Sequence, residues 1–114
     1  LFRSLTLFAS EIALKRHAGK LKHIYGPSGK KTIAEGKDLT NVKYIVGTGG
    51  PLTRLPNRVS ILNQILKNTN TLELLPPSDA QVLIDNDYIM ASLGVMSKKY
   101  PEIALKLLKK SLNL

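Results

Sequence analysis

The sequence predicts an α/β fold in which helices pack on a small mixed sheet with one hairpin, and two features of the chain indicate it. The first is a short apolar run at 44–46 that opens into three glycines and is followed, after two prolines, by a helical pattern. The second is an alternation of apolar and polar residues at 21–25 that ends in a Gly-Pro-Ser-Gly turn. Short strands interspersed with amphipathic helices are typical of this fold class.

The chain opens with an expected amphipathic helix at 1–18. Apolar residues recur there at spacings of four and three: Leu1, Leu5, Phe8 and Ile12. Glu11 and Lys15 form a favourable pair on the outer face, which makes the apolar stripe the inner face. Gly19 follows where a glycine commonly ends a helix.

A hairpin is expected next, with strands at 21–25 and 32–34 around a turn at 26–29. The turn and Lys30 resemble a phosphate-binding P-loop at first sight. That motif needs a glycine five positions before the glycine of its Gly-Lys pair, and Ile24 stands there. No helix follows to present its N-terminus either, so the hairpin turn is the better interpretation.

The middle of the chain is expected to hold the central strand at 44–46 and a helix at 57–66. Apolar residues fall at helical spacing in this helix: Val59, Ile61, Leu62, Ile65 and Leu66. Asn57 is a suitable N-cap and Asn68 a suitable stop, with a loop at 68–70.

Two short strands and two helices are expected in the last part. The strands are placed at 72–75 and 82–84, and the acidic stretch 85–87 offers a cap for a helix at 88–98. Pro101 suits the first turn of a final helix, whose apolar residues lie opposite its lysines.

The composition indicates the class of protein to which the chain belongs. At 114 residues the chain is expected to be a single domain, and its 43% of hydrophobic and 22% of charged residues are ordinary for a globular protein. The absence of cysteine fits a reducing compartment, so we expect a cytoplasmic protein. No apolar run approaches the roughly 18 residues of a membrane span. The sequence does not begin with Met, and we expect it to be part of a longer protein.

The net charge of +9 attracts anions, but its pattern does not favour nucleic acid. The 17 Lys and Arg residues are scattered in runs of at most two, and no aromatic platform alternates with them. A basic nucleic-acid-binding domain is therefore the least favoured function. His17 and His23 lie on different expected elements without a carboxylate cluster, so no metal site is expected. Nothing pairs a nucleophile with a base, and no catalytic residue is expected.

The glycine segment is the expected ligand site. Gly47, Gly49 and Gly50 follow the central strand, and a backbone without Cβ atoms lets another molecule approach closely. A dinucleotide fingerprint is a weak interpretation, because Leu52 stands in place of its third glycine and Pro51 removes a donor. A glycine-rich turn with no ligand remains an alternative.

The segment 44–56 resembles the adenosine motif of the actin, Hsp70 and sugar-kinase ATPase superfamily, in which a buried strand ends in Gly-Gly beside the nucleotide. The segment 84–95 resembles the second connecting helix of that superfamily. The resemblance implies one ribonuclease-H-like lobe and, in the parent protein, ATP with Mg²⁺. It also implies that the three glycines let the nucleoside lie against bare backbone, while Thr48 offers its hydroxyl and Arg54 faces the base.

More narrowly, most of the chain resembles the C-terminal part of the MutL/GlmL family, accessory proteins of adenosylcobalamin-dependent glutamate mutase and related aminomutases. The stretches 15–19 and 36–40, the glycine segment and 83–110 carry this likeness. It implies an actin-like ATPase that activates or reactivates the mutase, with the mutase subunits and the remainder of its own ATPase domain as partners. Cobalamin would be met only through the mutase. The DNA mismatch-repair proteins of the same name have an ATP-lid glycine pattern that is absent here.

Two departures from the superfamily bear on activity. Its two phosphate-binding loops, each built on an Asp-x-Gly hairpin, are absent, so the chain alone is not expected to hydrolyse ATP. Pro51 and Leu52 make the segment before Thr53 and Arg54 one residue longer than in the chaperones. A non-enzymatic module that docks the mutase through its basic face and last helix is the main alternative. We also expect self-association, because an incomplete sheet leaves a free edge.

Overall fold

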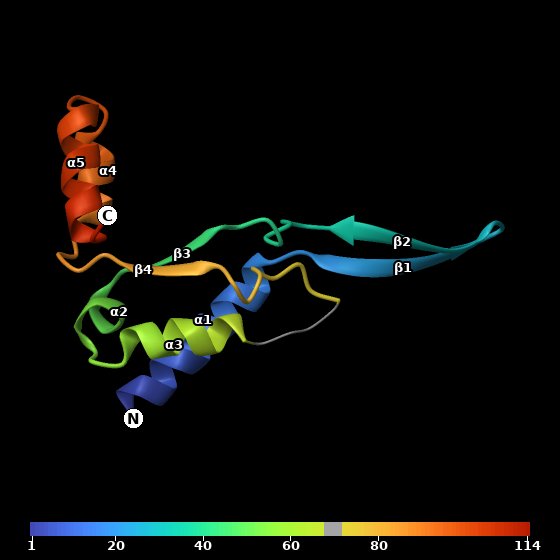
Figure 1. Ribbon diagram of the computed structural model, residues 1–114. Coiled ribbons are helices and arrows are strands. Elements are labelled where there is room, and N and C mark those ends of the chain that lie inside the picture. Colours follow the sequence, from blue (N-terminus) through green and yellow to red (C-terminus); the bar gives the residue numbers. More distant parts are fainter. Residues whose placement is uncertain (68–71) are drawn as a thin grey trace.

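Residues 1–67 and 72–114, which the computed structural model describes, form helices and two separate two-stranded sheets (Figure 1). In chain order the elements are α1 (Phe2–His17), β1 (Lys20–Gly26), β2 (Gly29–Glu35), β3 (Tyr44–Gly47), α2 (Gly50–Arg54), α3 (Arg58–Leu66), β4 (Gln81–Ile84), α4 (Met90–Met96) and α5 (Pro101–Ser111). The α/β class is confirmed. The two separate sheets take the place of the expected single mixed sheet, and the assignment to a ribonuclease-H-like lobe stays a prediction.

The parallel strands β3 and β4 form the centre of the molecule. They pair from Tyr44 with Gln81 to Gly47 with Ile84, and the crossover between them runs through α2 and α3. The core lies where α3 packs on these strands and on α1. Its buried members are Ile61, Leu62, Ile65 and Ile84. The predicted apolar stripe of α3 is therefore confirmed except at Val59, which is 46% exposed.

Helix α1 packs on α3 with a different face from the expected one. Leu7 and Leu14 contact the core, and Arg3 donates a hydrogen bond to the Gln64 side chain on α3 at 3.0 Å. The expected inner stripe, Leu1, Leu5, Phe8 and Ile12, is instead exposed, at 100%, 63%, 66% and 41%. The helix carries apolar residues on two sides, and the described chain supplies a packing partner for one of them.

The antiparallel hairpin β1–β2 is confirmed and projects from the body (Figure 1). Its register runs from Lys20 opposite Glu35 to Gly26 opposite Gly29, so Pro27 and Ser28 form the hairpin turn. A strand follows this turn where a P-loop would need a helix. Most of its residues are exposed. The expected strand at 72–75 is wrong: Glu73 forms only an isolated bridge with Lys20.

Several helix boundaries differ from expectation. The short helix α2 was not expected, because five residues beginning with Gly-Pro show no helical periodicity. Helix α4 begins at Met90 rather than Tyr88, because Tyr88 has a φ of 54°, outside the right-handed helical region. Asn57 is the N-cap residue of α3, but its side chain makes no capping hydrogen bond within the described structure. The expected loop at 68–70 and stop at Asn68 lie outside the described residues.

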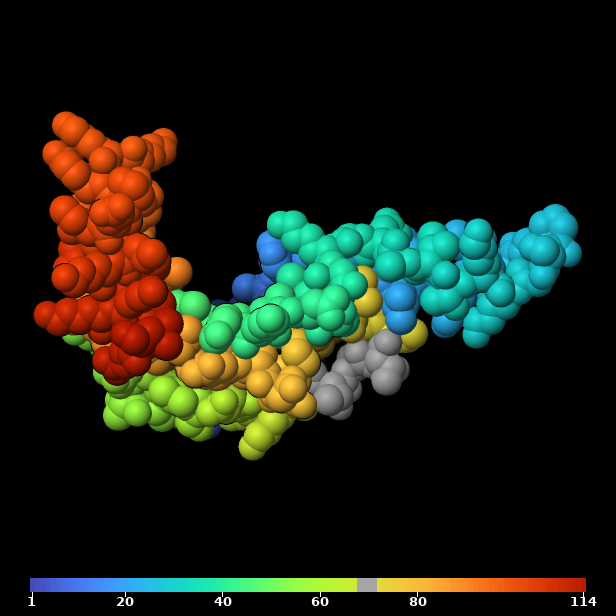
Figure 2. Space-filling model, turned by 45° about the horizontal axis from the view of Figure 1, so that its top comes forward, coloured from blue at the N-terminus to red at the C-terminus, as the bar shows by residue number. Residues whose placement is uncertain are grey.

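Helices α4 and α5 stand as a pair at one end of the molecule, and the hairpin extends at the other (Figures 1 and 2). The molecule measures 57 × 39 × 20 Å, and its radius of gyration is 17.3 Å. A compact chain of this length would have a radius of gyration of about 13 Å. Two projecting elements thus extend from a small core. None of the helices in the described parts is long and apolar enough to cross a membrane.

Candidate functional site

The glycine loop, residues 47–50, follows β3 and leads directly into α2. Gly49 is the N-cap residue of α2 and has a φ of 91°, a backbone conformation that residues with a Cβ rarely adopt. A Cβ built at Gly49 or Gly50 meets no atom within 4 Å. Gly47 is different, since its Cβ would lie 2.7 Å from Cδ1 of Leu62 and 3.0 Å from Cδ1 of Ile84. Gly47 is therefore needed for core packing, whereas Gly49 and Gly50 present open backbone.

Thr53 on α2 holds the loop in shape. Its hydroxyl donates to the carbonyl oxygens of Gly49 at 2.8 Å and Gly50 at 3.2 Å, and its N–H donates to Gly49 at 3.0 Å. The side chain is 5% exposed. A threonine one turn after a helix start can bond back to the preceding turn in this way. The Thr53 hydroxyl therefore fixes the backbone of Gly49 and Gly50.

Thr48 connects the loop to a second anchor, Asp85. The Thr48 hydroxyl donates to Oδ2 of Asp85 at 3.0 Å, and Asp85 follows β4, the parallel neighbour of β3. Because this hydrogen atom is engaged, the Thr48 oxygen can still accept a hydrogen bond from a ligand.

Asp85 is fully buried and accepts hydrogen bonds from three segments. Besides Thr48, these come from the hydroxyl of Ser111 at 2.6 Å, the N–H of Met90 at 2.9 Å and the N–H of Ile89 at 3.3 Å. Burial raises the pKa of Asp85, but the bonds from Ser111, Met90, Ile89 and Thr48 outweigh it, and the net pKa lies below the usual value. Asp85 caps α4 as the sequence predicts, and it also joins the glycine loop to the end of α5.

A groove of about 420 Å³ opens beside the loop. Its lining comes from two segments: Phe2, Leu5 and Ala9 of α1, and Thr48, Pro51 and Leu52 around the loop. Of the five residues predicted for the site, Thr48 lines this groove. Arg54 lies exposed in the last turn of α2.

The two histidines lie apart from the loop. His17 ends α1, and Nδ1 of His23 on β1 lies 3.0 Å from the hydroxyl oxygen of Thr32. Among the described residues, no group of three or more His, Asp or Glu side chains could hold a metal ion.

Comparison with known proteins identifies the family to which this chain belongs. A family model described as MutL protein matches residues 1–112. The chain belongs to the MutL protein family. It is also 34% identical over 104 residues to "Protein MutL" of Clostridium tetanomorphum, an alignment that covers 91% of this chain and 22% of that relative. The chain thus spans about a fifth of the length of this MutL relative. No solved structure matches. The family resemblance drawn from the sequence is confirmed.

Sequence reasoning placed the glycines and Thr48 but missed two residues that position them in this MutL segment. Thr53 lies within the segment 44–56, four residues after Gly49, and this position is a local signal. For Asp85 the sequence indicates only a helix cap, because its contacts with Thr48 and Ser111 join residues 37 and 26 positions away.

Proposed function

We propose that this chain is the nucleoside-binding portion of an actin-like ATPase that activates or reactivates an adenosylcobalamin-dependent aminomutase. The observation that carries the proposal is the open backbone at Gly49 and Gly50, next to an apolar groove at the carboxyl end of β3. Ligands of α/β sheets bind in crevices at the carboxyl ends of parallel strands. Membership of the MutL family supports the accessory role.

In this proposal the nucleoside lies against Gly49 and Gly50, and Thr48 accepts a hydrogen bond from it. Arg54 is exposed on α2, one helical turn beyond Gly50, and its guanidinium is available to the base. Asp85 is not a ligand for Mg²⁺, because both of its oxygens already accept hydrogen bonds within the protein. The residues that hold Mg²⁺ and the phosphates would therefore come from the remainder of the ATPase domain.

Gly50→Val in the full-length protein tests the nucleotide site. Gly50 has open space around its Cβ position, so valine adds a side chain without a clash inside the protein. We expect at least a tenfold loss of ATP affinity in calorimetry, because the added methyl groups occupy the space of the nucleoside. Gly94→Ala in α4 is the matched control, since its Cβ position is also open. Unchanged ATP affinity in Gly50→Val would refute the assignment.

A docking module for the mutase is the second candidate, and the exposed surface of the α4–α5 pair favours it. Val95, Ile103 and Leu105 are 73%, 55% and 53% exposed. A pull-down of the mutase subunits with and without ATP separates the candidates. Capture that is independent of ATP and lost in Ile103→Ser favours docking alone, whereas ATP-dependent capture favours the ATPase.

A further inference from the structure

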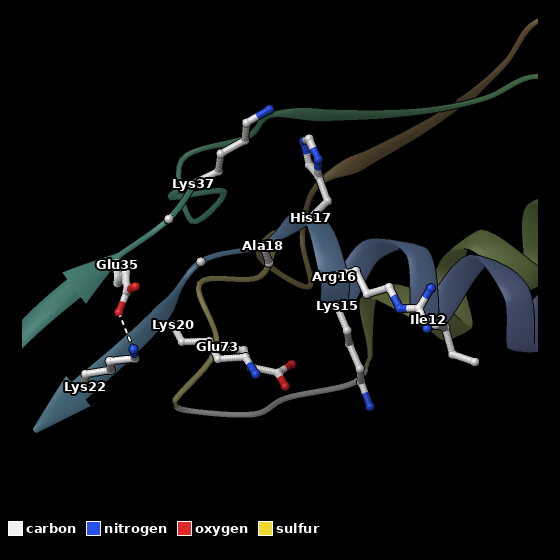
Figure 3. A pocket seen from close by; sticks show the side chains of 12 residues that line it. Ile12, Lys15, Arg16, His17, Ala18, Lys20, Lys22, Glu35, Lys37 and Glu73 are labelled. Carbon is white, nitrogen blue, oxygen red and sulfur yellow. Dashed lines mark ion pairs between the residues drawn. The ribbon is translucent and has the colours of Figure 1, made fainter.

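A second cavity, of about 710 Å³, lies at the other end of α1, where the hairpin leaves the body (Figure 3). Figure 3 shows the side chains that line it extending from several segments that meet near Ala18. Five of them are cationic: Lys15, Arg16, Lys20, Lys22 and Lys37. The glycine loop does not line this cavity, so it is distinct from the proposed nucleoside site.

Two glycines build the floor of this basic cavity. A Cβ at Gly19 would lie 2.5 Å from the carbonyl oxygen of Glu35 and 2.8 Å from the carbonyl carbon of Gly36. A Cβ at Gly36, which has a φ of 91°, would lie 2.9 Å from Cα of Gly19. Only glycine allows this contact between two backbones. It brings the end of α1 against the segment that follows β2.

Backbone hydrogen bonds at Gly19 fix three segments around the basic cavity. The Gly19 N–H donates to the Lys37 carbonyl at 2.6 Å, and the Gly19 carbonyl accepts from the Leu74 N–H at 2.8 Å. The backbones of Lys20 and Glu73 also form an isolated antiparallel β-bridge. These main-chain contacts hold together the backbone segments that carry the cations, which come from more than one helix or strand.

The cations of the cavity are mostly unpaired. Lys22 forms an ion pair with Glu35 at 2.5 Å. Within the described residues, none of the other four cations has a carboxylate oxygen within 4.0 Å. The buried Oε2 of Glu73 has no hydrogen-bond partner among the described residues. Counting both glutamates, the cavity keeps an excess of three positive charges, which attracts anions.

Helix polarity accounts for only part of this arrangement. Lys15 and Arg16 lie in the last turn of α1, where cations stabilise the negative end of the helix. Lys20 and Lys37 lie outside α1, on β1 and on the segment after β2. Both residues line the same cavity as Arg16, and an anionic ligand would account for this grouping.

We propose that the basic cavity binds a small organic phosphate that carries two or more negative charges. Its volume lies in the range of small-molecule sites. Arg16 offers the planar fork that binds phosphate oxygens in pairs, and lysine ammonium groups add compact charges. Among the described residues, no Phe, Tyr or Trp lines the cavity, which is unlike a groove for single-stranded nucleic acid.

Calorimetric titration of the full-length protein with inorganic pyrophosphate at 150 mM salt tests this proposal. We expect saturable binding by the wild type and at least a tenfold loss of affinity in Lys20→Gln/Lys37→Gln. The matched control is Lys106→Gln/Lys110→Gln, which removes two exposed charges from α5, outside the cavity, and should change the affinity less than twofold. Circular dichroism and the thermal midpoint verify that both variants fold.

Three results would overturn the proposal. The wild type could fail to bind pyrophosphate at millimolar concentration, or both double variants could lose affinity equally, which would show a general charge effect. Duplex DNA could also displace pyrophosphate and bind more tightly with a steep dependence on salt, which would identify a nucleic-acid surface. Gly50→Val should retain pyrophosphate binding, so failure here is distinguishable from failure of the proposed ATP site.

Discussion

Ser111 donates its hydroxyl hydrogen to Oδ1 of Asp85 at 2.6 Å, and both side chains are buried. The hydroxyl oxygen of Ser111 in turn accepts from the N–H of Asp87 at 3.0 Å. Asn86 adds two bonds to the Ser111 carbonyl, from its backbone N–H at 3.1 Å and its side-chain amide at 2.9 Å. The last turn of α5 is thus fastened to the segment after β4, and through Asp85 to the glycine loop.

Asp85→Asn is expected to destabilise the protein. An amide keeps the shape but replaces one acceptor oxygen with an NH₂ group, which would face the donors of Thr48 and Met90 or of Ser111 and Ile89. Hydrogen bonds to a charged group contribute about 1.5–3 kcal/mol each, so we expect a loss of about 3 kcal/mol in urea unfolding. The control Asp87→Asn alters an exposed side chain and should cost less than about 0.5 kcal/mol. Equal effects of the two variants would contradict the role of Asp85.

The stability of the protein should fall in acid partly because of Asp85. Its folded pKa lies below the ordinary 3.8, so the folded state binds fewer protons than the unfolded state near that pH. The stabilisation is therefore complete above the unfolded pKa and is lost as the pH falls through the folded pKa. Asp38, whose pKa is lowered by Thr40, acts in the same direction but is exposed. Thermal midpoints measured from pH 7 to pH 3 should fall less steeply for Asp85→Asn than for the wild type.

Gly19→Ala should disrupt the base of the hairpin. The new methyl group would lie within 3.0 Å of backbone atoms of Glu35, Gly36 and Lys37, which cannot move independently. Overpacking costs about 1–3 kcal/mol in general, and contact with fixed backbone places this variant at the upper end. Gly26→Ala is the control, because its Cβ position is open. Hydrogen exchange of β1 and β2 amides should rise in the first variant only; protection equal to that of the control would contradict the contact.

Thr53→Val should loosen the glycine loop. The substitution keeps the volume but removes the hydroxyl that donates to Gly49 and Gly50, at an expected cost of about 1 kcal/mol in unfolding free energy. If the nucleoside lies on this loop, ATP affinity should also fall several-fold. Thr53→Ser retains the hydroxyl and should retain most of the affinity. Equal ATP affinity in the two variants would show that the hydroxyl does not position the loop for a ligand.

Glu35→Gln should change stability very little. Its ion pair with Lys22 joins two side chains that are 59% and 58% exposed. Exposed pairs contribute about 0–1 kcal/mol and weaken with salt. We expect a change below about 0.5 kcal/mol in urea unfolding at 150 mM salt. A loss above that value would show that the pair is shielded from water.

The elements that the sequence predicted well are those specified by neighbouring residues. The hairpin follows from alternation and a turn at 26–29, and α3 follows from a stripe with helical spacing. The face of α1 that packs on the core could not be predicted in this way. Leu5 and Leu7 are both apolar, and the one that contacts the core depends on where α3 lies.

The same distinction between local and long-range features applies to the two candidate sites. The glycines after β3 are visible as a local motif, whereas the contacts that hold them involve residues distant in sequence. The cations of the basic cavity looked scattered along the chain. They converge because Gly19 meets Gly36, and a contact between two backbones leaves no periodic pattern in the sequence.

The anchoring by Ser111 has a consequence for how the protein emerges from the ribosome. Translation proceeds at about 5–20 residues per second, with the N-terminal part first. Thr48 and then Asp85 therefore leave the exit tunnel while the codon for Ser111 is still unread or its residue is still enclosed. For those seconds the shortest hydrogen bond of the anchor is missing. The glycine loop gains its final support only when Ser111 is released.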